Sequence, residues 1–258
     1  MKKLLAGIMT TAVMVALMGC TPKAKIEINS EADLADKKIG CQAGTTGEIY
    51  IQENLPNAQY KSFKTGIDAA LDLKNRAIDA VVLDELPAKE IVRRNPDLMI
   101  ADVQFATEEY AIAVRKGDSA LLSSINKTIA AIKSDGTYEK MINAYMPVDG
   151  NISTLSVSGG ASSSDIVKMG TNAAFPPFEY TLGTKVEGFD IYMSELIARD
   201  YGKKLQVVDM NFDGLIAALQ SGAIDFIAAG MSATDERRKN VDFSEPYYTS
   251  NQVIIIRK

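Results

Sequence analysis

The sequence predicts an α/β fold of two lobes, because a strand–helix–strand unit occurs in it twice. Residues 63–84 and residues 212–230 each contain a Phe, a Gly, a short helix, the triplet Ala-Ile-Asp and an apolar strand. Each final strand is a nearly continuous apolar run, which is typical of a parallel sheet covered on both faces. A chance similarity between two ordinary α/β units is the alternative. Residues 20–258 are enough for one large domain or two small lobes.

The helices of the two units carry apolar residues at helical spacing, so we expect each set to lie on one face. The sets are Ile67, Ala70 and Leu71 in the first helix, and Leu215, Ile216 and Leu219 in the second.

The remaining segments fit the same fold class. A strand is predicted around residues 39–42, and helices with a break near Asp135-Gly136 are predicted over residues 119–145. Residues 189–201 show a helical apolar stripe that ends at a Gly, and a strand follows at residues 204–210. Residues 147–165 are rich in Ser and Gly, which predicts a flexible linker.

The N-terminus has the composition of an export signal. Residues 1–19 contain two lysines and an apolar run that is too short to span a bilayer. The run ends in Leu17-Met18-Gly19-Cys20, which resembles the lipobox of bacterial lipoproteins, where the Cys is lipidated. We therefore expect an extracytoplasmic protein anchored to a membrane through Cys20. An ordinary signal peptide with a chance Cys is the alternative.

The composition excludes several classes of function. The chain has 28 Lys and Arg against 33 Asp and Glu and no basic run, so nucleic acid is not an expected partner. It has no His, which excludes Ser-His-Asp and Cys-His catalysis and every His-metal site. Cys41 is the only cysteine after Cys20, so the soluble part forms no internal disulfide. We expect no cofactor.

Candidate ligand-binding residues follow the strands, because open α/β sheets bind ligands beyond the carboxyl ends of their strands. In "GMSATDERR", Thr234 can cap a helix whose first turn holds Arg237. A guanidinium there suits a carboxylate ligand, although a solvated surface Arg is the alternative. In "QAGTTGEIY", Thr45 and Thr46 begin a second helix that could receive an anion or could simply be capped.

Three further residues complete this candidate site. Asp84 ends a buried strand, where a carboxylate needs a cation or several donors; a helix cap or turn residue is the alternative. Phe175 and Phe212 lie in two loops of one lobe and could flank a side chain, although ordinary apolar packing is the usual role of Phe. An Arg, an Asp and aromatic walls together match a free α-amino acid.

The motifs resemble the polar amino-acid-binding proteins of bacterial ABC importers, a family of extracytoplasmic solute receptors. The resemblance is carried by "GTNAAFPPFEY", "VEGFDIYMSELIA", "FDGLIAALQSGAIDFIAAGMSATDERRKNVDFSEPYY", "GCQAGTTGE" and "AIDAVVLDELPA". It covers residues 25–145 and 166–258. It implies a two-lobed type 2 periplasmic-binding-protein fold with the ligand in the cleft between the lobes.

The two halves stand in exchanged order, so the chain resembles a circular permutant of that family. Residues 147–165 would join the original C-terminus to the original N-terminus. The resemblance implies one lobe over residues 22–108 and another over residues 109–258. We expect the C-terminal strand to pack beside the remaining crossing strand, which is expected near Tyr110–Lys116.

The resemblance also assigns roles. Arg237 would bind the ligand α-carboxylate, with Ser232, the backbone of Gly230 and Thr46 nearby, and Asp84 would bind the α-ammonium. Phe175 and Phe212 would flank the ligand side chain, and Asn172 and Gln42 would face its far end. Two neutral residues at the far end favour a polar amino acid such as glutamine. Arginine stays open, because Glu179 or Glu48 could contribute charge.

The implied function is delivery of a free amino acid, by lobe closure, to a membrane permease and its ATPase. The implied protein is a monomer and not an enzyme. Two alternatives stay open: a sensor domain that presents its ligand to a receptor, and a dehydratase-like enzyme on the same fold, with Glu179 as its candidate acid.

Overall fold

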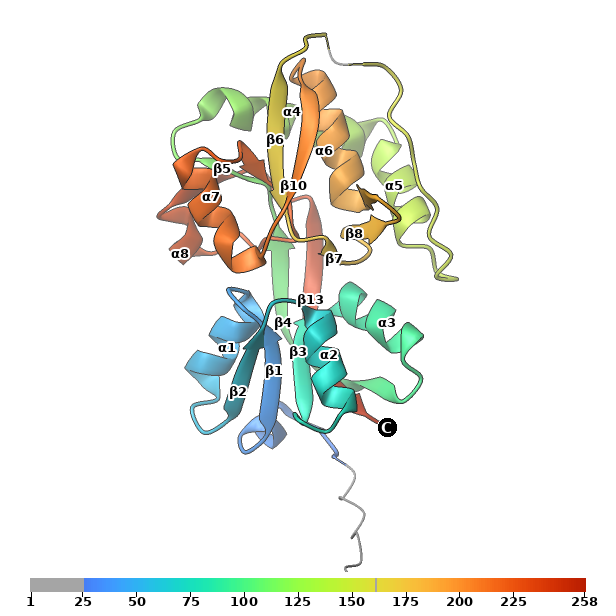
Figure 1. Cartoon of the computed structure of the whole chain (residues 1–258), viewed down its shortest axis with the longest axis vertical. Coiled ribbons are helices and arrows are strands. Elements are labelled where there is room, and N and C mark those ends of the chain that lie inside the picture. The colour runs from blue at the N-terminus through green and yellow to red at the C-terminus, as the bar shows by residue number, and fades with distance from the viewer. Residues whose placement is uncertain (1–25, 161) are drawn as a thin grey trace, which may run out of the picture.

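The computed structural model describes residues 26–160 and 162–258, which form two α/β lobes (Figure 1). The two-lobed α/β architecture predicted from the sequence is confirmed. The expected signal segment, residues 1–19, and the expected lipidation site, Cys20, lie outside the described residues.

The first lobe is built on a five-stranded sheet with the strand order β2-β1-β3-β13-β4. Its elements are η1 (Glu31–Leu34), β1 (Lys38–Gln42), α1 (Thr46–Asn54), β2 (Gln59–Phe63), α2 (Gly66–Lys74), β3 (Ala80–Asp84), α3 (Glu85–Arg94), β4 (Leu98–Tyr110) and β13 (Tyr248–Arg257).

The second lobe is built on a five-stranded sheet with the order β10-β6-β11-β5-β12 and a small sheet β7-β8-β9. Its strands are β5 (Ala113–Arg115), β6 (Ile166–Thr171), β7 (Ala174–Phe175), β8 (Glu179–Leu182), β9 (Lys185–Glu187), β10 (Lys204–Asp209), β11 (Phe226–Ile227) and β12 (Val241–Phe243). Its helices are α4 (Ser119–Ser134), α5 (Thr137–Tyr145), α6 (Phe189–Asp200), η2 (Phe212–Gly214), α7 (Leu215–Ser221) and α8 (Asp235–Arg238).

The two sheets share one plan, as the repeated strand–helix–strand unit predicts. In each sheet the first three strands are parallel, as in the pairs β1–β2 and β6–β10. The fourth strand of each sheet is antiparallel to the third, as in β13–β3 and β5–β11. The carboxyl ends of the parallel strands therefore offer a ligand-binding edge in each lobe.

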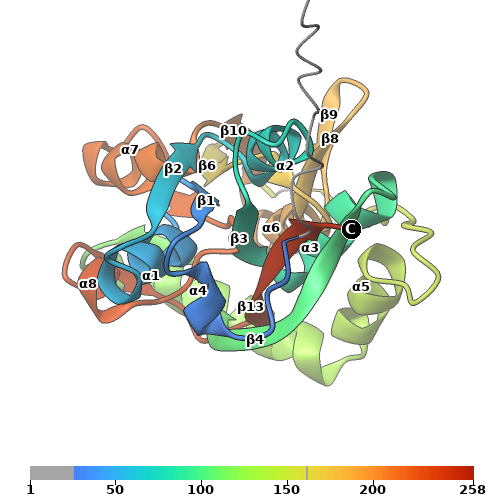
Figure 2. The same cartoon turned by 90° about the horizontal axis from the view of Figure 1, so that it is seen from below.

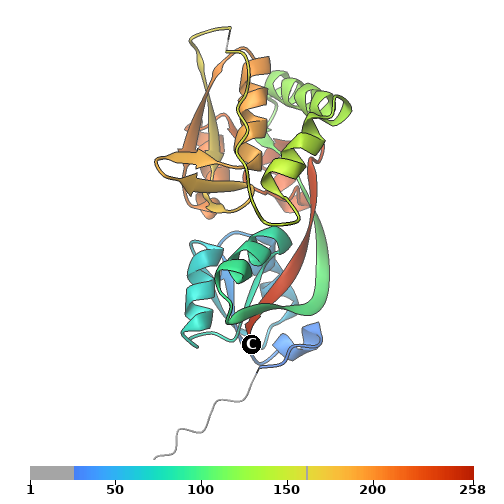
Figure 3. The same ribbon diagram turned by 90° about the vertical axis from the view of Figure 1, so that its right-hand side faces the viewer.

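Two strands, β4 and β13, run side by side from the first lobe towards the second (Figures 1 and 3). Their antiparallel pairing extends from Leu98 opposite Arg257 to Tyr110 opposite Tyr248. The C-terminal strand thus packs beside the other crossing strand, as expected. The crossing strand itself, β4, ends at Tyr110, where the sequence had suggested that it begins.

The sheet memberships correct the expected division at residues 22–108 and 109–258. β13 belongs to the sheet of the first lobe, where it lies between β3 and β4 (Figure 2). The apolar side chains Val253–Ile256 pack in the core of that lobe. The first lobe therefore takes its sheet from two separated parts of the sequence, because the C-terminal strand supplies its fourth strand.

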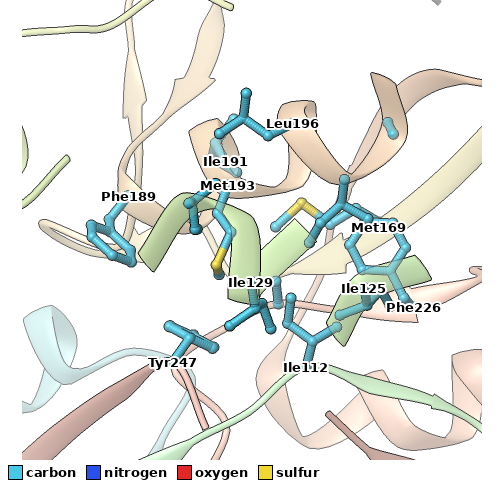
Figure 4. Close-up of a cluster of buried hydrophobic side chains, with 14 of the residues drawn as sticks. Ile112, Ile125, Ile129, Met169, Phe189, Ile191, Met193, Leu196, Phe226 and Tyr247 are labelled. Atoms are coloured by element: carbon cyan, nitrogen blue, oxygen red, sulfur yellow. The ribbon is translucent and has the colours of Figure 1, made fainter. Parts of the chain in front are cut away.

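The core of the second lobe lies between its sheet and the helices α4, α5 and α6. Figure 4 shows Met169 and Phe226 of the sheet facing Ile125 and Ile129 of α4 and Met193 of α6. All five side chains are buried. The predicted helix over residues 189–201 is confirmed as α6, and the predicted break near Asp135-Gly136 separates α4 from α5.

Helix α2 faces the core differently from the prediction. Ala69, Ala70 and Leu73 are buried, whereas Ile67 and Leu71 are 49% and 57% exposed. The helix therefore packs its small residues against the sheet, because Ala allows a close approach of helix and strands, and it turns two larger side chains outward.

The predicted linker contains neither helix nor strand in its described part, but it contacts the second lobe. Its apolar residues Ile152, Leu155 and Val157 pack against the core. The amide of Leu155 also donates a hydrogen bond to the hydroxyl oxygen of Tyr145 over 3.2 Å. Within residues 26–160 and 162–258, no helix combines the length and the apolar character needed to cross a bilayer.

Candidate functional site

A pocket lies between the two lobes, with about 430 Å³ of space not occupied by atoms when the open solvent at its mouth is included. All the ligand-binding residues expected from the sequence line this pocket: Gln42, Thr46, Asp84, Asn172, Phe175, Phe212, Gly230, Ser232 and Arg237. The structure brings them together from the carboxyl ends of β1 and β3 and from the segments that follow β1, β6, β10 and β11. Their role in binding stays a prediction.

Arg237 is the buried cation of the pocket, with 7% of the residue exposed. Thr234 caps α8 by accepting a hydrogen bond from the Arg237 amide, as the sequence predicts. The guanidinium donates from Nη1 to the carbonyl of Ser232 over 2.8 Å and lies 5.4 Å from the centre of the Phe212 ring. Burial lowers the pKa of Arg237, and the carboxylates of Glu108 and Asp84 oppose that effect.

Asp84 is the opposing acid, and it comes from the other lobe. It ends β3 and is 7% exposed. Tyr110 donates a hydrogen bond to Oδ2, and Gln252 donates from Nε2 to Oδ1 over 2.5 Å. Burial raises the pKa of Asp84 to about 8, and Glu108 adds to this rise while Tyr110 and Arg237 oppose it. This carboxylate therefore gains from a cationic ligand group, which would replace lost hydration.

Two hydrogen bonds join the lobes across the pocket. Gln42 of the first lobe donates from Nε2 to Oδ1 of Asn172 over 2.8 Å. Arg237 of the second lobe donates from Nη2 to the carbonyl oxygen of Gly44 over 2.9 Å. Both lobes therefore contribute to one site, and rotation of one lobe against the other would break both bonds.

The pocket is walled by aromatic rings and closely packed backbone. Phe175 stacks on Phe178, with ring centres 5.8 Å apart, and lies 6.5 Å from the ring of Tyr110. Gly230 has a positive φ of 53°, and a Cβ atom built on it would come within 2.6 Å of the Phe175 ring. Glycine suits this position, because an added side chain would clash with the ring and because a positive φ disfavours other residues.

Glu179 is a second buried acid at the pocket. The residue is fully buried, and neither carboxyl oxygen has a hydrogen-bond partner among the described residues. Burial raises its pKa well above the ordinary value, and the neighbouring Asp190 adds to the rise. Asp190 is held by the hydroxyl of Tyr247 at 2.7 Å and the amide of Gly230 at 3.0 Å. Glu179 thus keeps unused acceptor capacity beside the pocket.

Glu48, the other acid considered as a source of charge, is engaged elsewhere. Its carboxylate accepts hydrogen bonds from the amide of Gly44, over 2.7 Å, and from the hydroxyl of Ser62. It is not one of the residues that line the pocket in the described part of the chain.

Sequence reasoning missed several lining residues: Val82, Leu83, Ala229 and Gln252. Gln252 is the most informative, since it is 2% exposed within an apolar strand. Its polar side chain in the run "NQVIII" was a usable signal. The described residues contain no cluster of His, Cys, Asp and Glu that could hold a metal ion.

Comparisons with known proteins show what this chain is similar to. Residues 167–258 match the family described as bacterial extracellular solute-binding proteins, family 3. The arginine-binding extracellular protein ArtP of Bacillus subtilis (strain 168) is 43% identical over 101 residues, which are 39% of this chain and 40% of ArtP. A probable histidine-binding protein of Campylobacter jejuni is 46% identical over 98 residues, 38% of each chain.

Among solved structures, the arginine-bound form of domain 1 from TmArgBP is 40% identical. The alignment covers 36% of this chain and 80% of that domain, with a TM-score of 0.32. The present chain aligns with less than half the length of the two curated relatives named above.

Proposed function

We propose that the chain is a member of the bacterial extracellular solute-binding proteins of family 3, and that it binds a free polar L-amino acid between its lobes and delivers it to an ABC importer. The family description names solute binding, which supports a binding protein over an enzyme. The observation that carries the proposal is one buried cation and one buried acid, from different lobes, at a single pocket.

The two charged groups match the two charged ends of an amino acid. Arg237 binds the α-carboxylate through its planar fork, with the hydroxyl of Ser232 and the N-terminal end of α1 at Thr46 nearby. Asp84 binds the α-ammonium. Closure of the lobes around both ends would exclude water and strengthen both interactions.

The far end of the ligand lies among Asn172, Gln42 and Glu179. The unused carboxyl of Glu179 favours a cationic or strongly donating ligand group, so we infer an arginine-like ligand, with glutamine as the neutral alternative. A relative named for arginine binding supports arginine ahead of glutamine as the ligand. A sensor domain would bind in the same way and would differ only in its membrane partner.

We further propose a circular permutation and a lipid anchor. The family match is confined to residues 167–258, and a matched sheet plan precedes it in the chain. Residues 147–165 would then join the original ends of the family's fold. Lipidation of Cys20 would hold the protein, as a monomer, on the outer side of a membrane.

The test is calorimetric titration of the protein lacking residues 1–19, unfolded and refolded to remove carried ligand, against a panel of amino acids. We expect one-to-one binding of arginine or glutamine, and a loss of at least about a hundredfold in Arg237→Ala. Arg238→Ala is the matched control, because Arg238 is exposed on the same short helix. Absence of binding across the panel would refute the proposal.

A further inference from the structure

The two crossing strands each bring one polar side chain to the back of the pocket. β4 carries Glu108, and β13 carries Gln252. The amide nitrogen of Gln252 lies 2.5 Å from Oδ1 of Asp84 and 3.3 Å from Oε1 of Glu108. A single amide group therefore bridges two carboxylates that belong to different strands.

These contacts continue into the second lobe. Ser232 donates its hydroxyl to Oε2 of Glu108 over 2.6 Å. The carbonyl oxygen of the same serine accepts the hydrogen bond from Nη1 of Arg237 over 2.8 Å. An unbroken series of contacts thus runs from the acid of the first lobe to the cation of the second through Gln252, Glu108 and Ser232.

We propose that Glu108 and Gln252 are positioning residues of the ligand site, which fix the carboxylate of Asp84 and connect it, across the crossing strands, to the guanidinium of Arg237. The inference rests on the proposed function in so far as Asp84 and Arg237 hold the two ends of one ligand. Gln252 lines the pocket, whereas Glu108 lies behind it, in a depression that it shares with Thr46 and Ser232.

The orientation of the Gln252 amide follows from its partners. Nε2 of Gln252 faces both carboxyl groups, which fits their ionised forms because an ionised carboxylate can only accept hydrogen bonds. The amide oxygen of Gln252 is left buried without a partner in the described part of the chain. This unmet acceptor is the cost of holding two acids with one side chain, and it argues that the contact to Asp84 is needed.

Glu108 and Gln252 shift the pKa of Asp84 in opposite directions. The charged or titratable groups that shift the pKa of Asp84 are Glu108, Tyr110 and Arg237. Asp84 in turn raises the pKa of Glu179. Beyond burial, the negative charge of Glu108 raises the pKa of Asp84. The hydrogen bond from Gln252 stabilises the ionised carboxylate and works against this rise. Loss of Glu108 should therefore lower the pKa of Asp84, and loss of Gln252 should raise it.

The first arm of the test needs no ligand. The pKa of Asp84 is measured by NMR, from the chemical shift of its carboxyl carbon over a pH series. The measurement is made on the protein lacking residues 1–19 and on its variants. Glu108→Gln should lower the pKa of Asp84 from its value of about 8, and Gln252→Leu should raise it. Glu109→Gln is the control, since Glu109 is the exposed neighbour on the same strand. Unchanged values, or shifts of one sign in both variants, would overturn the inference.

The second arm measures binding of arginine and glutamine by calorimetry. Glu108→Gln and Gln252→Leu should each weaken binding by about tenfold or more, as expected for a lost hydrogen bond to a charged group. Asn251→Ala should leave it unchanged, because its side chain contacts Thr107 and Glu85 instead. Full affinity in both site variants would contradict the positioning role. If the unaltered protein binds no amino acid, the proposed function fails. The NMR titration would still show whether Glu108 and Gln252 act on the carboxyl of Asp84.

Discussion

The side-chain amide of Gln42 donates a hydrogen bond to Oδ1 of Asn172 over 2.8 Å, and this bond joins two residues that lie in different lobes. Both side chains are also tied to their own lobe. Gln42 donates to the carbonyl of Lys64 over 3.0 Å, and Asn172 donates to the carbonyl of Met210 over 2.9 Å. The pair is therefore held from both sides and stabilises this arrangement of the lobes.

Gln42→Ala should weaken ligand binding about tenfold, because it removes a buried hydrogen bond that only the closed arrangement makes. The free energy of unfolding should change much less than the affinity, since each lobe keeps its own core. Calorimetric titration and urea unfolding measure the two quantities. Gln52→Ala, an exposed glutamine on α1, is the control. An equal loss of affinity in both variants would contradict a role of the pair in closure.

Asp84 predicts a pH dependence of stability in the absence of ligand. Its pKa of about 8 in the folded protein lies above the ordinary value of 3.8, so the folded state holds this proton more tightly than the unfolded state. The free energy of unfolding should fall as the pH rises through this window, by at most about 1.4 kcal/mol per pH unit from this group.

The variant Asp84→Asn should flatten this slope, because the amide does not ionise. Denaturant unfolding at a series of pH values measures it, and Asp235→Asn, an exposed aspartate, serves as the control. Since Glu179 is shifted in the same direction, part of the slope should remain. A slope identical to that of the unaltered protein would show that Asp84 does not hold the proton.

Gly230→Ala should reduce both stability and binding. The positive φ of 53° disfavours alanine, and the added Cβ would lie 2.6 Å from the Phe175 ring. The expected loss is about 1–3 kcal/mol in the free energy of unfolding. Gly214→Ala is the matched control, because no atom lies within 4 Å of its added Cβ. Equal stability of the two variants would contradict the steric argument.

Glu179→Gln should change ligand preference more than stability. The carboxyl lines the pocket with both oxygens unpartnered. A guanidinium beside it would oppose the burial that raises the pKa of Glu179 and would favour the ionised carboxylate, a charge that an amide cannot carry. We expect the affinity for arginine to fall about tenfold or more relative to that for glutamine. Glu195→Gln, on the exposed side of α6, is the comparison in the same titrations. An unchanged ratio of the two affinities would show that Glu179 does not contact the ligand side chain.

The residues at the strand ends were predictable from the sequence, because loop position and residue chemistry together limit where a ligand can bind. Arg237 and Asp84 lie far apart in the chain, and the α/β pattern alone brings them to neighbouring edges. The connection between them was not predictable, although the polar Gln252 in an apolar strand was a signal of a special role. Glu108 and Gln252 lie inside long strands, and only the pairing of β4 with β13 places them behind the pocket.

Which side of α2 packs against the sheet was also not predictable from the sequence pattern. Leu71 and Ile67 recur at helical spacing, but so do Ala70 and Leu73, and both sets form a stripe on the helix. The side with the smaller residues packs against the sheet, because the helix can then lie closer to the strands. Such a choice depends on the shape of the surface that the helix meets, which hydrophobic periodicity does not describe.

The place of β13 in the first sheet has a consequence for the order of synthesis. β3 and β4 are made early, yet the strand that lies between them is the last element of the chain. A nascent chain on the ribosome can complete the second lobe, whose described strands and helices all precede Tyr248, before the first lobe gains its fourth strand. The first lobe to be translated is therefore the last to be finished, and its exposed strand edges would need protection until the chain is released.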